Sequence, residues 1–138
     1  MAFQENDNRT FEIVEALYQL VLDNSRQSPN GKCIECRGTN QSGYVRIEMT
    51  VNKHRHRLGA HQIVLMHFLR VTCLPGREYN NTVSHLCHNK KCVNVNHLML
   101  ERQGVNNTRI ACNRARHCYG HYLVGYGKLP NCIFIQRI

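Results

Sequence analysis

The 138-residue chain carries 18 Lys and Arg against nine Asp and Glu, which gives a formal net charge of +9. This length predicts a single domain, and the positive charge favours a polyanionic partner, with nucleic acid before an anionic membrane surface. The sequence has no run of about 18 apolar residues, so no membrane-spanning helix is expected. Its polar, acidic start lacks the basic and then apolar pattern of a secretory signal, so an intracellular protein is expected.

Eight cysteines and nine histidines are the most informative part of the composition. Eight cysteines could form four disulfides in a secreted protein. Because no secretory signal is seen and histidines lie among the cysteines at the spacing of metal ligands, zinc binding is the favoured interpretation.

The first predicted element is an amphipathic helix. Thr10 can cap a helix that runs to about Asp23 or Asn24, and residues 1–9 before it are expected to be loosely held. The apolar residues of this helix fall on one face at helical spacing, which predicts packing in the core or in a dimer. They are Phe11, Ile13, Val14, Leu17, Leu20 and Val21.

A Cys-x2-Cys pair, Cys33 and Cys36, follows a loop with strong turn chemistry at residues 25–32. Such a pair is half of a common zinc site. It could also be a redox motif, but the βαβ context that this motif needs is missing. A contribution to a structural zinc site is therefore favoured.

Two strands of a basic hairpin are predicted next. Residues 37–43 read as a turn, residues 44–51 alternate apolar and polar side chains, and residues 54–58 begin a second strand after a turn at Asn52-Lys53. A β-ribbon rich in Arg, Lys and His can enter a DNA groove and contact phosphates and base edges, whereas the alternative is an ordinary solvated hairpin. The candidate DNA contacts are Arg46, Lys53, Arg55 and Arg57.

Residues 60–71 are predicted to form a helix. His61 and His67 are expected to be packed or hydrogen-bonded rather than bound to metal. Cys73 is expected to be a spare, buried thiol, and residues 75–82 a polar loop. The predicted buried face of the helix consists of Ile63, Val64, Met66, His67 and Leu69.

The middle of the chain holds two cysteines and a histidine at Cys-x4-Cys-x4-His spacing. They are Cys87, Cys92 and His97. Structural zinc takes four Cys or His ligands, so Cys33 or Cys36 is the expected fourth. Such a site would tie the front of the chain to its middle, and structural zinc contributes roughly 10–16 kcal/mol to small metal-dependent folds.

A second set of potential ligands follows near the end of the sequence. It consists of Cys112, Cys118, His121 and Cys132, and His117 is a competitor for the role of His121. A Cys3His site here would give fixed structure to a tail rich in Gly and Tyr. The alternative is that some of these residues are free thiols. Two sites use all but two of the eight cysteines, which favours two zinc ions.

Two further residues, His85 and Asn106, are needed for neither site. A histidine can accept a proton from water near neutral pH. Asn106 lies in a segment, residues 100–107, that can form a helix, and its amide oxygen is a suitable Mg²⁺ ligand. By chemistry alone, an isolated His and Asn serve structure more often than catalysis.

The same region closely resembles the His-Cys box homing endonucleases, which are ββα-metal (His-Me finger) nucleases encoded by mobile introns. The resemblance runs without gaps and is carried by Ser84-His85-Leu86-Cys87-His88-Asn89, Cys92, His97-Leu98, Glu101, Asn106 and Cys112. It implies an α+β fold stabilised by zinc, with an antiparallel DNA-binding sheet, helices and long loops. A single endonuclease domain, residues 1–138, would then consist of an N-terminal helical arm (1–27) and a zinc-bound catalytic core (28–138).

The resemblance also implies roles for individual residues. His85 would be the general base and Asn106 the ligand of one catalytic Mg²⁺. Arg46 resembles the arginine that contacts the scissile phosphate in this family. The two cysteine-histidine sets would hold two structural zinc ions. The implied activity is Mg²⁺-dependent, site-specific double-strand cutting of DNA, which leaves 5′-phosphate and 3′-hydroxyl ends.

Two other functions fit part of the same pattern. Residues 92–97 also resemble the zinc loop of Smad MH1 domains, which are non-catalytic DNA-binding modules, although the presence of both His85 and Asn106 favours an enzyme. A low-specificity, host-adopted nuclease is the other alternative. A homodimer could use a surface such as the N-terminal helix, and the nucleus is the expected location in a eukaryote.

Overall fold

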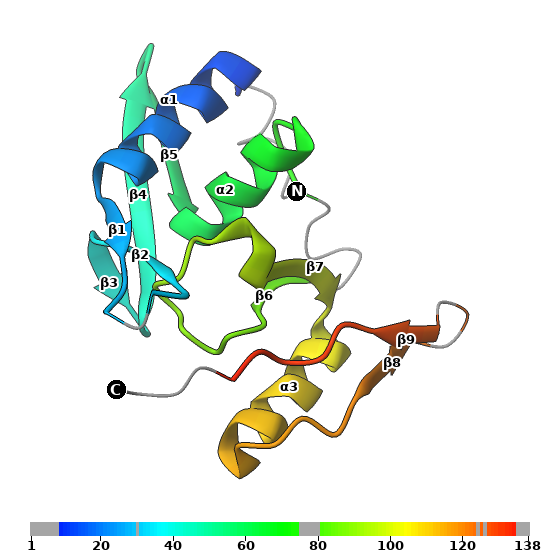
Figure 1. Ribbon diagram of the computed structural model, residues 1–138. Helices are drawn as coiled ribbons and strands as arrows, with labels where there is room; N and C mark the ends of the chain where they lie inside the picture. The colour runs from blue at the N-terminus through cyan, green and yellow to red at the C-terminus, as the bar shows by residue number, and fades with distance from the viewer. Residues whose placement is uncertain (1–8, 30, 75–80, 124, 126, 135–138) are drawn as a thin grey trace.

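The computed structural model describes residues 9–134 apart from 30, 75–80, 124 and 126. This part combines three α-helices with antiparallel sheets of two or three strands, as the expected α+β class requires (Figure 1). The helices are α1 (Phe11–Asp23), α2 (Ala60–Leu69) and α3 (Gln103–Ala115), with a short 3-10 helix, η2 (Val95–His97). The strands are β1 (Ser25–Gln27), β2 (Ile34–Cys36), β3 (Thr39–Gln41), β4 (Tyr44–Val51), β5 (His54–Gly59), β6 (Asn81–His85), β7 (Leu98–Arg102), β8 (His121–Leu123) and β9 (Gly127–Leu129).

Helix α1 begins and ends where the sequence predicted. The Thr10 side chain accepts a hydrogen bond from the backbone N–H of Ile13 at 3.4 Å, which caps the helix. Val14, Leu17 and Val21 are fully buried, and the helix packs against α2 (Figure 1). The apolar face of α1 therefore belongs to the core of this chain.

Arg9 corrects the expectation that residues 1–9 are loosely held; residues 1–8 lie outside the described part. The Arg9 side chain is buried, and its guanidinium donates to Nδ1 of His56 at 3.4 Å and to the carbonyl of Thr72 at 3.3 Å. Because a buried guanidinium needs hydrogen-bond partners, these contacts fix the approach to α1.

The predicted hairpin is confirmed as β4 and β5. Its turn residues, Asn52 and Lys53, both have positive φ angles, 50° and 67°, as a two-residue type I′ turn requires. One face of the hairpin packs on the core through residues such as Val45 and Ile47, while the other face is exposed. The third strand of this sheet, β3, was not predicted, since residues 37–43 had been read only as a turn.

Helix α2 is shorter than predicted. It ends at Leu69 because Arg70 adopts a left-handed conformation with φ of 57°. His67 stacks on the ring of Tyr18 at a centroid distance of 3.8 Å, which confirms that it is a packed histidine. Leu69 is 46% exposed, so its assignment to the buried face was wrong, and Cys73 is only half-buried.

Strands β6 and β7 pair and lead into α3, and together they form a ββα unit (Figure 1). Neither strand was predicted: Asn81 and Thr82 were assigned to a loop, and residues 100–102 were read as helical. The pairing of His85 with Leu98 and of Asn81 with Arg102 instead extends the chain up to the start of α3 at Gln103. The loop between the two strands, residues 86–97, carries most of the predicted first zinc site and is called the zinc loop below.

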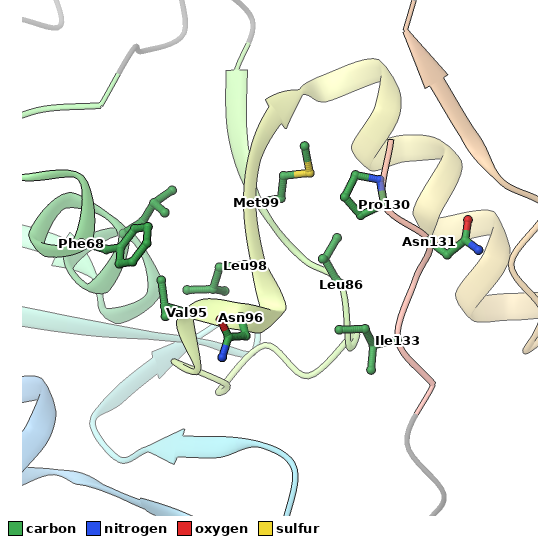
Figure 2. Close-up of a pocket in the computed structure, with 10 residues that line it drawn as sticks. Phe68, Leu86, Val95, Asn96, Leu98, Met99, Pro130, Asn131 and Ile133 are labelled. Carbon is green, nitrogen blue, oxygen red and sulfur yellow. The ribbon is translucent and has the colours of Figure 1, made fainter. Parts of the chain in front are cut away.

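An apolar groove of about 500 Å³ lies between α2, β7 and the C-terminal segment (Figure 2). Figure 2 shows Phe68, Met99 and Ile133 among its lining residues, and none of the residues that line the groove is ionisable. The groove therefore offers no acid or base for catalysis, and the ionisable side chains considered below lie outside it.

Candidate active site and metal centres

The first set of potential ligands comes together in space. Cys33, Cys87, Cys92 and His97 are buried, and their ligand atoms lie within 4.8 Å of one another. Nδ1 of His97 lies 3.7 Å from Sγ of Cys33 and 3.5 Å from Sγ of Cys92. In a tetrahedral zinc site with Zn–S of about 2.3 Å and Zn–N of about 2.05 Å, sulfur and nitrogen ligands are about 3.6 Å apart. The four residues thus fit a zinc ion.

Backbone pairing between β2 and the zinc loop brings Cys33 to this cluster. The N–H of Val93 donates to the carbonyl of Ile34 at 2.7 Å, and the N–H of Cys36 donates to that of Lys91 at 3.0 Å. The Cys36 thiol itself points into the hydrophobic core beside the carbonyl of Arg37. Of the two cysteines that the sequence left open, the structure therefore places Cys33 in the cluster.

Hydrogen bonds between the thiols of this cluster shift their pKa values. A hydrogen bond from Cys87 lowers the pKa of Cys92 to about 5, and the same bond raises the pKa of Cys87. Burial raises the pKa of Cys33. The thiolate is the form that binds metal, so the cluster already favours one of its sulfurs as an anion.

The second set also forms a cluster. Ligand atoms of Cys112, Cys118, His121 and Cys132 lie within 4.8 Å of one another. Nε2 of His121 lies 3.6 Å from Sγ of Cys112 and 3.3 Å from Sγ of Cys132, which again suits a tetrahedral zinc site. His117, the competitor, is exposed and packs edge-on against Tyr119.

Thr108 fixes the ring of His121. The Thr108 hydroxyl donates to the carbonyl of Val105 at 2.6 Å, so its oxygen can accept a hydrogen bond from Nδ1–H of His121, 2.8 Å away. A proton on Nδ1 leaves the lone pair on Nε2, which faces the cysteines. Second-layer hydrogen bonds of this kind hold metal-binding histidines in the productive tautomer.

A buried ion pair links this cluster to the ββα unit. Arg109 donates to both carboxylate oxygens of Glu101, at 2.6 and 2.9 Å, and the side chains are 1% and 2% exposed. The same guanidinium donates to Sγ of Cys132 at 3.6 Å. Because this one side chain contacts both β7 and the C-terminal segment, it fixes the second cluster against the unit that carries His85.

His85 and Asn106 lie on neighbouring parts of the ββα unit. His85 ends β6, and Asn106 lies near the start of α3. The hydroxyl of Ser84 donates to Oδ1 of Asn106 at 2.9 Å, so the end of β6, where His85 lies, is tied to the start of α3. Oδ1 has a second lone pair, and this hard oxygen suits Mg²⁺.

The tautomer of His85 is set by the zinc loop. Nε2 of His85 lies 3.1 Å from the carbonyl oxygen of Cys92. A carbonyl only accepts, so Nε2 carries the proton and Nδ1 carries the lone pair. Burial lowers the pKa of His85 to about 4, which keeps the ring neutral at pH 7. A neutral imidazole with a lone pair on Nδ1 can take a proton from water.

The family model for the zinc-binding loop region of homing endonucleases matches residues 32–133. The chain belongs to this homing endonuclease family. Together with the two clusters, the match confirms a zinc-stabilised α+β nuclease fold, and it assigns the chain a nuclease and DNA-binding role. A search of curated proteins finds no match.

Two aromatic rings border His85 in this homing endonuclease. The His61 ring lies 4.6 Å from that of His85, and Tyr44 lies 5.8 Å from His85 and 5.4 Å from His61. Nζ of Lys90, from the zinc loop, lies 4.9 Å from the centre of the Tyr44 ring. The sequence predicted His61 only as a packed or hydrogen-bonded residue, because its contact with His85 spans 24 residues and leaves no local pattern.

The basic hairpin reaches this site through Arg46. Burial, with smaller contributions from the neighbouring His85 and Arg46, lowers the pKa of His61 to about 3. Arg46, Arg55 and Arg57 are exposed on the outer face of the hairpin, and Lys53 is exposed at its turn. Three of the candidate DNA contacts, Arg46, Arg55 and Arg57, therefore share the exposed face of the hairpin.

No helix in the part of the chain that the structure describes is long and apolar enough to cross a membrane.

Proposed function

We propose that this chain is a site-specific DNA endonuclease that makes Mg²⁺-dependent double-strand cuts. The observation that carries the proposal is the His85–Ser84–Asn106 arrangement. His85 is a neutral histidine with its lone pair on Nδ1, and the residue before it in β6, Ser84, holds the Asn106 amide whose oxygen is suited to Mg²⁺. Family membership supplies the nuclease class, and this arrangement supports the reaction chemistry.

His85 acts as the general base in this proposal. Its Nδ1 takes a proton from a water molecule, whose oxygen forms a bond to phosphorus while the bond from phosphorus to the 3′ oxygen breaks and that oxygen takes a proton from a solvent water. The products are a 5′-phosphate and a 3′-hydroxyl. The hydrogen bond from Nε2 to the carbonyl of Cys92 holds the ring in this tautomer and orients it throughout.

Asn106 Oδ1 would hold the single Mg²⁺, which when bound supplies positive charge that offsets the charge developing on the phosphate oxygens. Arg46 places a guanidinium at the scissile phosphate and adds to this electrostatic stabilisation. The Ser84 hydroxyl orients the Asn106 amide so that its oxygen points toward the strand that bears His85.

The zinc ions are structural in this proposal. Cys33, Cys87, Cys92 and His97 hold the first, and Cys112, Cys118, His121 and Cys132 hold the second. Four protein ligands leave no open coordination position, so neither zinc activates water.

A plasmid cleavage assay with and without Mg²⁺ tests the proposal. We expect supercoiled plasmid that contains a target site to become linear only with Mg²⁺, and mapped ends to carry 5′-phosphates. His85→Ala should lose cleavage. His117→Ala removes an exposed histidine outside both clusters, so it is the matched control for His85→Ala and should cleave normally. Duplex binding without cleavage at any Mg²⁺ concentration would instead favour the non-catalytic MH1-type module. Cutting at many unrelated positions would favour the low-specificity nuclease.

The cutting of both strands also bears on assembly. One His85–Asn106 pair serves one strand, so we propose that a homodimer cuts the duplex, and sedimentation of the DNA complex tests this.

We further propose that residues 1–138 act as one endonuclease domain, and that a eukaryotic host would carry it in the nucleus, where genomic targets lie.

A further inference from the structure

The outer face of the hairpin carries one acidic residue among its basic ones. Glu48 is the only acid between Tyr44 and Gly59 in the sequence. Its Oε2 accepts a hydrogen bond from Nη2 of Arg55 at 2.7 Å, and its Oε1 lies 3.1 Å from Nε of Arg57. One carboxylate therefore contacts two arginines, with one oxygen for each.

The strand register explains this geometry. Glu48 lies directly opposite Arg57 across the hairpin, and Thr50 lies opposite Arg55. Directly opposite residues of an antiparallel pair share a face, and diagonal neighbours remain within reach of long side chains. All three charged side chains stay substantially exposed, at 40% for Glu48 and Arg57 and 65% for Arg55. The triad lies on the surface that faces solvent.

Neither stability nor general DNA affinity accounts well for Glu48. Exposed ion pairs contribute little to folding because water screens them. A carboxylate on a surface that binds DNA repels phosphates and reduces the number of cations available to neutralise them. What the carboxylate does supply is a fixed position for two long, otherwise mobile side chains.

We propose that Glu48 is a specificity-determining residue that positions Arg55 and Arg57 to read two guanines in the major groove. The inference rests on the proposed function and extends it by placing the hairpin in the major groove, as a β-ribbon rich in arginine can be. A guanidinium carries five N–H donors, so it can contact Glu48 and still pair with O6 and N7 of a guanine. Arg55 and Arg57 are two residues apart on one strand, a spacing of about 6.8 Å. Two base-pair steps span about the same distance, so the guanines lie about two base pairs apart.

Glu48→Gln separates positioning from simple charge. The substitution keeps the size of the side chain but removes the charge that holds both guanidiniums. Binding to unrelated duplex should become several-fold tighter, with a steeper salt dependence, because a repulsive charge is lost. Selectivity for the two guanines should fall at the same time. The loss of charge alone would tighten binding to unrelated duplex, so only the fall in selectivity for the guanines distinguishes a positioning role from a merely structural one.

The experiment selects bound sequences from a random duplex library with the full-length, zinc-loaded chain. Wild type should enrich a site with two guanines about two base pairs apart. Arg55→Ala and Arg57→Ala should each lose one guanine, and Glu48→Gln should weaken both. Glu15→Gln, the same charge change at an exposed position of α1, is the matched control and should leave the enriched site unchanged.

Several results would overturn the inference. One is an unchanged site for Glu48→Gln when the arginine variants do change it. Another is that Glu48→Gln changes the enriched site only by losing a preference for a cytosine, which would mean that Glu48 contacts a base directly. If wild type binds duplex without enriching any sequence, the inference fails while DNA binding stands; if wild type binds no duplex, the proposed function fails with it. Arg55→Lys is a second test should Glu48→Gln not fold. Lysine keeps the positive charge but lacks the planar fork of arginine, so the enriched site should lose only one of its two guanines.

Discussion

At the scale of single residues, Cys92 connects the proposed first zinc site with the proposed general base, His85. Its thiol belongs to the first cluster, while its carbonyl oxygen accepts the hydrogen bond from His85. A zinc ion that fixes the Cys92 side chain thereby also fixes the acceptor that sets the tautomer of His85. This coupling explains how a structural metal can support catalysis without touching the substrate.

Thr108→Val should weaken zinc binding at the second cluster only. The substitution removes the oxygen that lies 2.8 Å from Nδ1 of His121, so the ring loses its preferred tautomer. Loss of such a partner typically lowers metal affinity about 10–100-fold. Competition with a chelator measures this, and Thr50→Val, on the exposed hairpin face, is the control. Equal zinc affinity in the variant and the wild type would mean that Thr108 does not orient His121.

His61 should make folding sensitive to acid. Burial lowers its pKa from 6.5 to about 3 in the folded chain, so the unfolded chain binds the proton more readily. Its contribution to stability is complete above about pH 6.5 and is lost progressively as the pH falls toward 3. The free energy of unfolding of wild type should thus fall more steeply over this range than that of His61→Phe. Both proteins keep the same zinc ligands, so acid acts on those ligands equally in the two. The difference between their free energies of unfolding at each pH therefore reports on His61. Parallel pH dependences would contradict a lowered pKa for His61.

At the scale of elements, local patterns predicted α1, the β4–β5 hairpin and most of α2, because apolar periodicity and turn residues act within a few positions. They missed β6 and β7, whose pairing joins residues separated by the zinc loop. The same reason explains the open choice between Cys33 and Cys36, since both fit the spacing and only the contact of β2 with the zinc loop distinguishes them. The residues of the ββα unit were identified through family resemblance, and composition alone gave only zinc and a polyanionic partner.

Glu101→Gln should destabilise the junction of β7 and α3. The substitution leaves the buried charge of Arg109 without its ionic partner, and breaking a buried pair costs roughly 3–5 kcal/mol. Denaturant unfolding measures this loss. Glu48→Gln breaks an exposed ion pair and is the matched control, with little expected loss because water screens exposed pairs. Similar losses for the two variants would mean that the buried pair does not stabilise the junction.

At the scale of the whole molecule, the two clusters join segments that are far apart in the sequence. The first joins β2 to the zinc loop, and the second joins α3 to the C-terminal segment. The N–H of Ile133 donates to the carbonyl of Leu86 at 2.7 Å, so the C-terminal segment also lies against the zinc loop (Figure 1). Removal of zinc should therefore destabilise β2, the zinc loop and the C-terminal segment together.

Cys33→Ser and Cys36→Ser give a matched test of this architecture. Cys33→Ser should lose one equivalent of zinc and unfold at a lower temperature, because it removes a ligand of the first cluster. Cys36→Ser should retain both equivalents, since its thiol lies in the apolar core. Metal analysis of the purified variants measures the difference, and a loss of zinc from Cys36→Ser alone would reverse the assignment.

The most direct test of the account is the single-turnover cleavage rate of His85→Ala against wild type at saturating Mg²⁺. Removal of a general base should slow cleavage by about 10²–10⁴-fold, while zinc content and duplex affinity stay close to those of wild type. A His85→Ala variant that cleaves at the wild-type rate would contradict the assignment of His85 as the base.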